Sequence, residues 1–205
     1  MPDSPSSPVF CIWITGLPGA GKSTLARAMA ETLSQRRLPC EVLDSGRLRQ
    51  TPVGARVGFT RSDRDDNVRR LAWTAGLLAS NGVVPIVAAV SPYRQAREEA
   101  RSHIGDMVEV WVSTPRETCI DRDTTGLWDR ALRGELRHFT GVDDPYEAPV
   151  APEVICDMAL LPLEYALGRV MKYVYTTGAL EAALAPLRDE QDSAVGRLRS
   201  IGYQE

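Results

Sequence analysis

Residues 16–23 read Gly-Leu-Pro-Gly-Ala-Gly-Lys-Ser, which is the spacing of a glycine-rich phosphate-binding loop. Glycines allow successive backbone N–H groups to converge on phosphate oxygens, while Lys22 can reach the β- and γ-phosphates and the Ser23 hydroxyl can bind Mg²⁺. The motif therefore predicts a site for a nucleoside triphosphate, with Mg²⁺ as cofactor. The residues expected to hold the triphosphate are Gly16, Leu17, Pro18, Gly19, Ala20, Gly21, Lys22, Ser23 and Thr24.

The segments on either side of this loop have the pattern that such a site needs. Residues 9–14 form an apolar run that predicts a buried strand, and good helix formers follow from Lys22, where a helix is expected to open. The positive end of that helix would face bound phosphate. The alternative is a glycine turn with an ordinary lysine, and the flanking strand and helix argue against it.

Strands and helices alternate along the remainder of the chain. Apolar runs predict strands at residues 41–44, 83–89, 107–112 and 153–156. Helical spacing of apolar residues predicts helices at residues 61–81, 94–103, 127–133 and 162–176. A further short helix is expected to open at Pro115, Gly82 is expected to cap a helix, and Pro85 is unusual inside a strand. The alternation predicts an α/β fold with a parallel, doubly wound sheet, whose sites lie at the carboxyl ends of the strands.

The pattern also predicts how the chain is divided. Residues 1–8 are expected to be a disordered leader, and residues 9–178 a single domain. The regular pattern fails between residues 126 and 149, and an irregular stretch of this length inside a compact domain usually forms a lid or a binding loop, so we expect a lid there. Residues 179–205 are expected to be a C-terminal helical extension, whose apolar stripe would pack against the domain or a twin subunit.

The composition argues against several classes of partner. The 205 residues are 43% apolar, enough for a full core, and their net charge of −3 predicts neither a nucleic-acid partner nor a membrane partner. No apolar run approaches the roughly 20 residues of a membrane span. Neither His103 nor His138 has a catalytic constellation, and both are expected at the surface. Four separated cysteines favour core thiols in a reducing, cytoplasmic compartment over a disulfide or zinc framework. They are Cys11, Cys40, Cys119 and Cys156.

Beyond the phosphate loop, four blocks of sequence occur in an order and spacing that resemble the adenylyl-sulfate kinase family. They are residues 58–70, 91–94, 122–127 and 134–149, and the resemblance extends from about residue 12 to residue 154. The phosphate loop is common to many kinases, whereas the other four blocks together are specific to this family. The resemblance implies a three-layer P-loop kinase fold with a lid insertion, and a homodimer.

The family transfers a phosphoryl group from MgATP to the ribose 3′-hydroxyl of adenosine 5′-phosphosulfate (APS), giving 3′-phosphoadenosine 5′-phosphosulfate. The resemblance implies catalytic roles for Lys22, Asp44 and Ser91, and Mg²⁺ ligation by Ser23 and Asp44. Candidates for the ATP side also include Arg122 and Arg130. The implied acceptor pocket consists of Asp44, Arg49, Phe59, Arg64, Asn67, Ser91 and Phe139.

The residue types in this implied pocket suit the acceptor. Two arginines can hold the phosphosulfate through charge-assisted hydrogen bonds, two phenylalanines can enclose the adenine, and Asn67 can read an edge of the base. Taken singly, each has an alternative: Arg64 could be a solvated helix charge, and Phe59 could belong to the core. Phe139, in a polar loop, is harder to explain as a core residue. Ser91 could in principle carry the phosphoryl group, although a hydrogen bond to the substrate or to a metal-bound water is favoured.

One loop departs from the family pattern. Where the family has Asp-Gly-Asp-Asn after the second strand, residues 44–47 read Asp-Ser-Gly-Arg, so Gly46 takes the place of the second carboxylate. A general base contributes about 10²- to 10⁴-fold, and phosphoryl transfer depends mainly on positioning and charge neutralisation, so Asp44 could still serve. Three interpretations stay open: an adenylyl-sulfate kinase with an altered loop, a relative redirected to another small hydroxylated acceptor, and a nucleotide-binding protein without turnover. The retained pocket residues favour the first.

Overall fold

The computed structural model describes residues 9–48, 51 and 58–187, which fold around one parallel β-sheet. Its five strands run in the order β2-β3-β1-β4-β5, and every neighbouring pair is parallel. Because β1 lies between β3 and β4, the loops that follow these strands meet at one edge of the sheet. The strands are β1 (Cys11–Thr15), β2 (Cys40–Asp44), β3 (Val84–Ala88), β4 (Met107–Val112) and β5 (Val154–Cys156).

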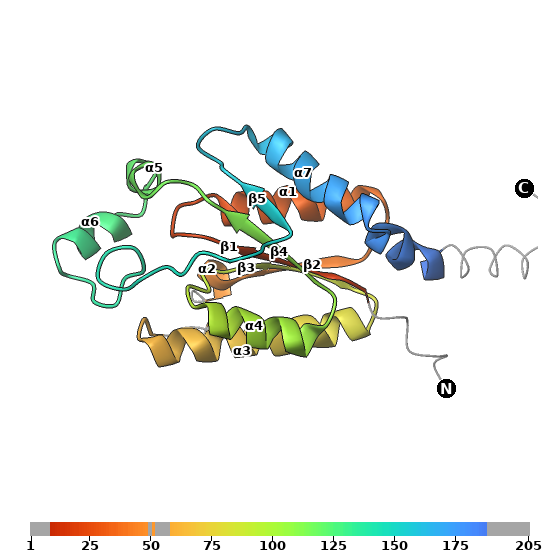
Figure 1. Ribbon diagram of the computed structural model, residues 1–205, viewed down its shortest axis with the longest axis horizontal. Helices are drawn as coiled ribbons and strands as arrows, with labels where there is room; N and C mark the ends of the chain where they lie inside the picture. The colour runs from red at the N-terminus through yellow and green to blue at the C-terminus, as the bar shows by residue number, and fades with distance from the viewer. Residues whose placement is uncertain (1–8, 49–50, 52–57, 188–205) are drawn as a thin grey trace, which may run out of the picture.

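Helices cover both faces of the sheet and complete three layers (Figure 1). One face carries α1 (Lys22–Gln35) and α7 (Leu163–Thr176), and the other carries α3 (Arg61–Ser80) and α4 (Arg94–Ile104). The short helices, which follow β2 and β4 in the chain, are α2 (Ser45–Leu48), α5 (Arg116–Asp121) and α6 (Leu127–Leu132). The predicted α/β fold with a parallel, doubly wound sheet is confirmed.

Strand β1 is buried along its whole length, and its alternate side chains belong to different cores. Ile12 and Ile14 join the apolar cluster formed with α1 and α7, whereas Cys11 and Trp13 join the cluster formed with α3 and α4. The strand is therefore held between two apolar layers, as the interior strands of a parallel sheet usually are. The loop that leaves its carboxyl end starts from a fixed position.

The predicted elements agree with the observed ones to within one or two residues at each end, and the range of β4 is the same in both. Gly82, with a φ of 75°, follows the C-cap residue of α3 and ends that helix as predicted. Helix α2 was not predicted, because four residues are too few to show a helical period in the sequence.

The proline inside β3 has a simple explanation in the pairing of the sheet. Val84 donates its N–H to the backbone oxygen of Pro39 on the β2 side, so the nitrogen of Pro85 faces β1. The pairing of β3 with β1 begins at Ile86. Pro85 therefore costs the sheet no hydrogen bond, although it lies inside an interior strand.

The segment 126–149 contains helix α6 and one isolated bridge, and is otherwise irregular. Asp143 organises its turn, because its carboxylate accepts hydrogen bonds from the backbone N–H groups of His138 and Phe139, each at 2.7 Å. In Figure 1 the segment lies at the end of the molecule where α5 and α6 are found. Its position is thus set by internal hydrogen bonds as well as by contacts to the domain.

The described part of the C-terminal extension packs against the domain. Residues 179–187 are helical, and Leu180 and Ala183 are buried in the cluster that contains α1 and α7. The rest of the predicted extension, residues 188–205, and the predicted leader, residues 1–8, lie outside the described residues.

Two further predictions from composition are borne out. The four cysteines are free thiols, three of them buried and Cys40 half-buried, as expected of core residues. His103 and His138 are both exposed. Within the described ranges, no helix is both long enough and apolar enough to cross a membrane.

Candidate active site

The phosphate loop joins the carboxyl end of β1 to the amino end of α1. Gly19 has a φ of 79°, and a Cβ atom there would lie 2.9 Å from the backbone oxygen of Cys119, so the position requires glycine. Gly21 is the N-cap of α1 and provides no side-chain cap. The first N–H groups of a helix have no partner within the helix, and here they lie at the loop, where an anion can accept from them.

Lys22 is the cation of this loop, and 8% of its surface is exposed. Its Nζ donates a hydrogen bond to the backbone oxygen of Leu17 at 2.7 Å. Burial lowers the pKa of Lys22 to about 8, and the nearby Cys119 and Asp44 only partly oppose this shift. A bound phosphate would supply the negative charge that the buried ammonium lacks, so the loop is suited to an anion.

A cavity of about 570 Å³ opens beside the phosphate loop at the carboxyl ends of β2 and β3. This volume lies within the range of small-molecule sites. The segment 126–149 and the start of α3 also contribute to its walls. The structure therefore brings candidates for the ATP side and for the acceptor side into one cavity. The predicted residues that line it are Pro18, Lys22, Ser23, Asp44, Phe59, Arg64, Asn67, Ser91 and Phe139.

Asp44 ends β2 and is buried. Its Oδ1 accepts hydrogen bonds from the backbone N–H groups of Gly46 at 2.8 Å and Arg47 at 3.3 Å, which fixes the start of α2. Asn67 on α3 donates from Nδ2 to the hydroxyl of Ser45 at 3.0 Å. Residues 45–47 therefore fix the positions of both Asp44 and Asn67. Both of their hydrogen bonds to the Asp44 carboxylate go to Oδ1.

Gly46, which stands where the family has its second carboxylate, has a backbone conformation that any residue can adopt. It lies inside α2 and does not have a left-handed φ. A Cβ atom there would lie 3.2 Å from Oδ1 of Asp44, and apart from the two neighbouring residues and the backbone of α2 no other heavy atom of the described chain lies within 4 Å. A side chain can therefore be added at this position after a small adjustment of Asp44.

Arg64 is buried near the start of α3 and joins two walls of the cavity. It donates from Nε to the backbone oxygen of Phe59 at 3.0 Å and from Nη2 to that of His138 at 2.8 Å. Phe139, on the wall formed by the segment 126–149, is buried in the apolar cluster that contains α1 and α7, and it packs edge-on against Trp128 with ring centres 5.0 Å apart. The burial of Arg64 excludes the alternative of a solvated helix charge, and half-buried Phe59 lines the cavity.

Ser91 is buried in the loop after β3 and has a left-handed φ of 37°. Its Oγ accepts a hydrogen bond from Nε1 of Trp13 at 3.1 Å and donates one to Oγ1 of Thr15 at 3.0 Å. Thr15 donates in turn to the backbone oxygen of Val90 at 2.8 Å. The hydroxyl proton of Ser91 is thus used inside the protein, which favours a role in positioning over that of a phosphoryl carrier.

Several predicted residues do not line the cavity, among them Gly16, Leu17, Gly19, Ala20 and Gly21 of the phosphate loop. Arg122 is exposed and donates to the backbone oxygen of Met158 at 3.0 Å, and Arg130 is exposed and lies 3.6 Å from an acidic neighbour. Thr24 is exposed at the start of α1. Arg49 lies outside the described residues.

Sequence reasoning missed other residues around the cavity. Arg27 and Arg47 add cationic side chains to its lining, and their closeness in the chain to the phosphate loop and to Asp44 was the available signal. Trp128 donates from Nε1 to the backbone oxygen of Pro18 at 3.1 Å, which ties α6 to the phosphate loop. No local signal could have shown this contact, because 110 residues separate its partners.

Comparison with known proteins adds independent evidence. The family model described as adenylylsulphate kinase matches residues 8–157. The adenylyl-sulfate kinase of Picosynechococcus sp. (strain ATCC 27264 / PCC 7002 / PR-6) is 47% identical over 167 residues, which cover 82% of this chain and 94% of that protein.

Solved structures agree with the sequence relatives. The APS kinase of Mycobacterium tuberculosis, in complex with AMPPNP and APS, is similar with a TM-score of 0.77 and 34% identity, covering 82% of this chain and 98% of that chain. The hexameric APS kinase from Thiobacillus denitrificans is similar with a TM-score of 0.65 and 30% identity, covering 85% of this chain and 30% of that chain. With its parallel sheet, phosphate loop and shared cavity, this chain belongs to the adenylyl-sulfate kinase family.

Proposed function

We propose that this protein is an ATP-dependent kinase that transfers the γ-phosphoryl group of ATP to the 3′-hydroxyl of APS, giving 3′-phosphoadenosine 5′-phosphosulfate and ADP. One observation carries the proposal: acceptor-side residues from distant segments converge on the cavity that the phosphate loop lines. Phe59, Arg64 and Asn67 come from the start of α3 and the residues before it, whereas Phe139 comes from the segment 126–149. Family membership supports the same activity.

On the ATP side, the phosphate loop would bind the triphosphate through backbone N–H groups, and Lys22 would neutralise charge on the transferring group. Mg²⁺, when bound, would neutralise further charge on the β- and γ-phosphates. Ser23 and Asp44 would hold it, because their hydroxyl and carboxylate line the same cavity. Mg²⁺ prefers oxygen ligands and is usually bound by one or two protein groups together with the phosphates of the substrate. Arg27 would add positive charge on the same side.

On the acceptor side, Phe59 and Phe139 would enclose the adenine, and Arg64 would face the phosphosulfate group. Asp44 would accept the proton of the 3′-hydroxyl, directly or through a water, as the hydroxyl oxygen bonds to the γ-phosphorus and the bond to ADP breaks. Such a base contributes less than correct positioning, because the transition state of phosphoryl transfer is loose. A single carboxylate is therefore sufficient.

The segment 126–149 would be the lid of this site. The hydrogen bond from Trp128 to Pro18 and the position of Phe139 in the cavity wall support this role, because both link the segment to groups that would contact nucleotides. A closed lid excludes water and so protects ATP from hydrolysis. Arg122 and Arg130 would reach the ATP side only after a rearrangement of their present contacts.

We further infer a homodimer in the cytoplasm. The solved relative from Thiobacillus denitrificans is named as hexameric, which supports self-association in the family. The free cysteines support a reducing compartment.

The test is a direct assay of the purified full-length chain with MgATP and APS, with the nucleotide products separated by chromatography. We expect conversion of APS to its 3′-phosphorylated product, with one ADP formed for each product molecule. A protein that binds ATP but leaves APS unchanged at high enzyme concentration would contradict the proposal.

The altered loop favours a second candidate, a kinase for another small hydroxylated acceptor. Gly46 and Arg47 line the cavity next to Asp44, so the surroundings of an acceptor hydroxyl differ from those of a loop with two carboxylates. The Gly46→Asp variant separates the candidates, because its backbone accepts a side chain. Activity on APS that is held or raised supports the first candidate. Activity on APS that stays absent, with loss of turnover on the true acceptor, supports the second.

A further inference from the structure

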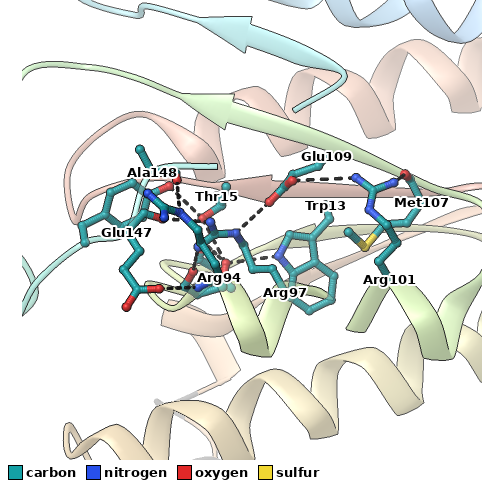
Figure 2. Close-up of polar contacts among 12 residues, drawn as sticks. Trp13, Thr15, Arg94, Arg97, Arg101, Met107, Glu109, Glu147 and Ala148 are labelled. Carbon is teal, nitrogen blue, oxygen red and sulfur yellow. Dashed lines mark hydrogen bonds and ion pairs between the residues drawn. The ribbon is translucent and has the colours of Figure 1, made fainter. Parts of the chain in front are cut away.

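Arg97 is a buried arginine on α4 that lies outside the cavity, with 3% of its surface exposed. Its guanidinium donates three hydrogen bonds to three different parts of the chain (Figure 2). Nε donates to the carboxylate of Glu109 at 2.7 Å, Nη1 to the backbone oxygen of Ser91 at 2.7 Å, and Nη2 to the backbone oxygen of Glu147 at 2.8 Å. A planar guanidinium that binds three acceptors fixes their relative positions.

Ser91, the first backbone partner of Arg97, has a conformation that its surroundings must stabilise. Ser91 lines the cavity, and its left-handed φ of 37° is uncommon for a residue with a side chain. A conformation of this kind is strained and persists only where the surroundings hold it. The hydrogen bond from Arg97 to the carbonyl of Ser91 holds the peptide in that orientation.

The second backbone partner lies at the end of the segment 126–149, which docks closely on α4. Glu147 donates its N–H to the backbone oxygen of Pro92 at 2.8 Å, and its carboxylate accepts from the N–H of Arg94, also at 2.8 Å. Arg94 donates from Nε to the backbone oxygen of Ala148 at 2.8 Å. Arg97 therefore binds the point where this segment rejoins the domain.

Hydroxyl groups also link the loop of Ser91 and the end of the 126–149 segment to β1, the strand before the phosphate loop. Thr15, which directly precedes Gly16, uses its proton on Val90, so it accepts hydrogen bonds from the hydroxyls of Ser91 and Tyr146, each at 3.0 Å. Burial raises the pKa of Tyr146 to about 12, which keeps the proton on that donor. The end of β1, the loop of Ser91 and residues 146–147 thus meet in one hydrogen-bonded network.

We propose that Arg97 is a positioning residue for the acceptor. With Glu109 as its buried counter-charge, it fixes Ser91 and the base of the 126–149 segment relative to the phosphate loop, and so sets the distance between the acceptor hydroxyl and the γ-phosphate. The inference rests on the proposed function for its kinetic consequence. Its structural consequence, the anchoring of residues 146–148, can be measured without any acceptor.

A purely structural ion pair is the competing explanation, and loss of Arg97 alone cannot test it. Such a loss would leave the carboxylate of Glu109 buried without its closest partner, which destabilises the fold whatever the role of Arg97. The informative variant is the double replacement Arg97→Met with Glu109→Leu, because exchange of a buried pair for apolar residues is often tolerated. It removes the hydrogen bonds to Ser91 and Glu147 together with both charges.

Arg101, one turn further along α4, offers a matched control. It pairs with Glu153 at 2.8 Å and donates to the backbone oxygen of Met107 at 2.6 Å, and it lies 3.7 Å from Glu109. In this network it is not bonded to Ser91 or Glu147. The Arg101→Met variant therefore removes an ion pair of the same region, together with the longer contact to Glu109, and leaves the hydrogen bonds of Arg97 to Ser91 and Glu147 in place. Arg97→Lys is a second comparison, because one ammonium can pair with Glu109 but lacks the fork that serves three acceptors.

The kinetic test compares these variants at a temperature well below unfolding. We expect the double variant to lose about tenfold or more in kcat/KM for APS, with the ATP dissociation constant nearly unchanged, because a displacement of less than 1 Å at the acceptor already lowers the rate. Arg97→Lys should keep an unfolding temperature close to that of the wild type, because the ammonium still pairs with Glu109. Its kcat/KM for APS should nevertheless fall, because it cannot bind all three acceptors. Arg101→Met should keep kcat/KM for APS. Wild-type kcat/KM in the double variant, or equal losses for APS and ATP, would overturn the proposal.

The acceptor-independent test is amide hydrogen exchange of the ligand-free protein. We expect faster exchange at residues 144–148 in the double variant and wild-type exchange there in Arg101→Met. Unchanged exchange in the double variant would overturn the anchoring role. If wild-type protein fails to phosphorylate APS while the exchange result holds, the proposed function fails and the anchor stands.

Discussion

The two halves of the candidate site are built in different ways. The half proposed to face ATP is eight consecutive residues that run from the end of β1 into the first turn of α1, and it would bind phosphate mainly through backbone N–H groups. The half proposed to face the acceptor is made of side chains from the ends of β2 and β3, the start of α3 and the segment 126–149. Asp44 and Lys22 lie where the two halves meet, because both line the shared cavity.

The difference shows what each half can tolerate. A backbone site depends on a few glycines and on a buried strand, so it keeps its function while its neighbours change. A side-chain site depends on the correct placement of elements far apart in the chain, and each residue in it can change alone. The altered loop at residues 44–47 lies in the second kind of site.

The largest effect should come from the ATP half. We expect Lys22→Ala to lower kcat by about 10³-fold or more, because the variant loses the cation that neutralises the transferring phosphoryl group. The fold should stay intact, since a buried ammonium with a pKa lowered to about 8 opposes folding at neutral pH. Steady-state kinetics and thermal unfolding at pH 7 check this. A variant that keeps more than roughly a tenth of the rate would show that the loop is not the catalytic centre.

Asp44→Asn should come next, with about a 10²-fold loss in kcat and little change in the ATP dissociation constant. The amide keeps the size of the side chain and an oxygen that can accept from Gly46 and Arg47, so the start of α2 should persist. Single-turnover rates with APS and equilibrium binding of ATP separate the two effects. A loss confined to ATP binding would assign Asp44 to the ATP half alone.

Arg64→Ala should affect the acceptor half and spare the ATP half. We expect kcat/KM for APS to fall about 30-fold, which corresponds to about 2 kcal/mol, because an anionic group of the acceptor loses a charge-assisted partner. Arg70→Ala, an exposed arginine on the same helix, is the control. Equal losses for ATP and APS would place Arg64 outside the acceptor half.

The smallest effect should be a pH dependence of ATP binding. The pKa of Lys22 is about 8 in the empty protein, so its ammonium is present at pH 7 and is lost above pH 8. Because binding requires that charge, the dissociation constant for ATP should rise about five- to tenfold between pH 7 and pH 9. Titration calorimetry should also show proton uptake. The same titration with Lys22→Ala should be flat, and a flat profile for the wild type would contradict the assignment.

Sequence predicted the local elements better than the contacts between distant segments, for a physical reason. The phosphate loop is a local pattern, and β4 is an apolar run whose ends are marked by polar residues, so both can be read from neighbouring positions. Arg122 was expected near ATP but donates to the backbone oxygen of Met158, 36 positions away. Arg97 was not predicted to have any role. Its three partners are 6, 12 and 50 positions distant, and no local period relates them.

The contact between Trp128 and Pro18 also gives this molecule an optical reporter. The indole of Trp128 is bonded to the phosphate loop and packed against Phe139, so its fluorescence depends on both halves of the site at once. Trp73 on α3 is largely exposed, Trp111 on β4 is half-buried, and neither lines the cavity, so binding should alter their emission less. Changes in emission as each nucleotide is added would follow the order in which the two halves are filled.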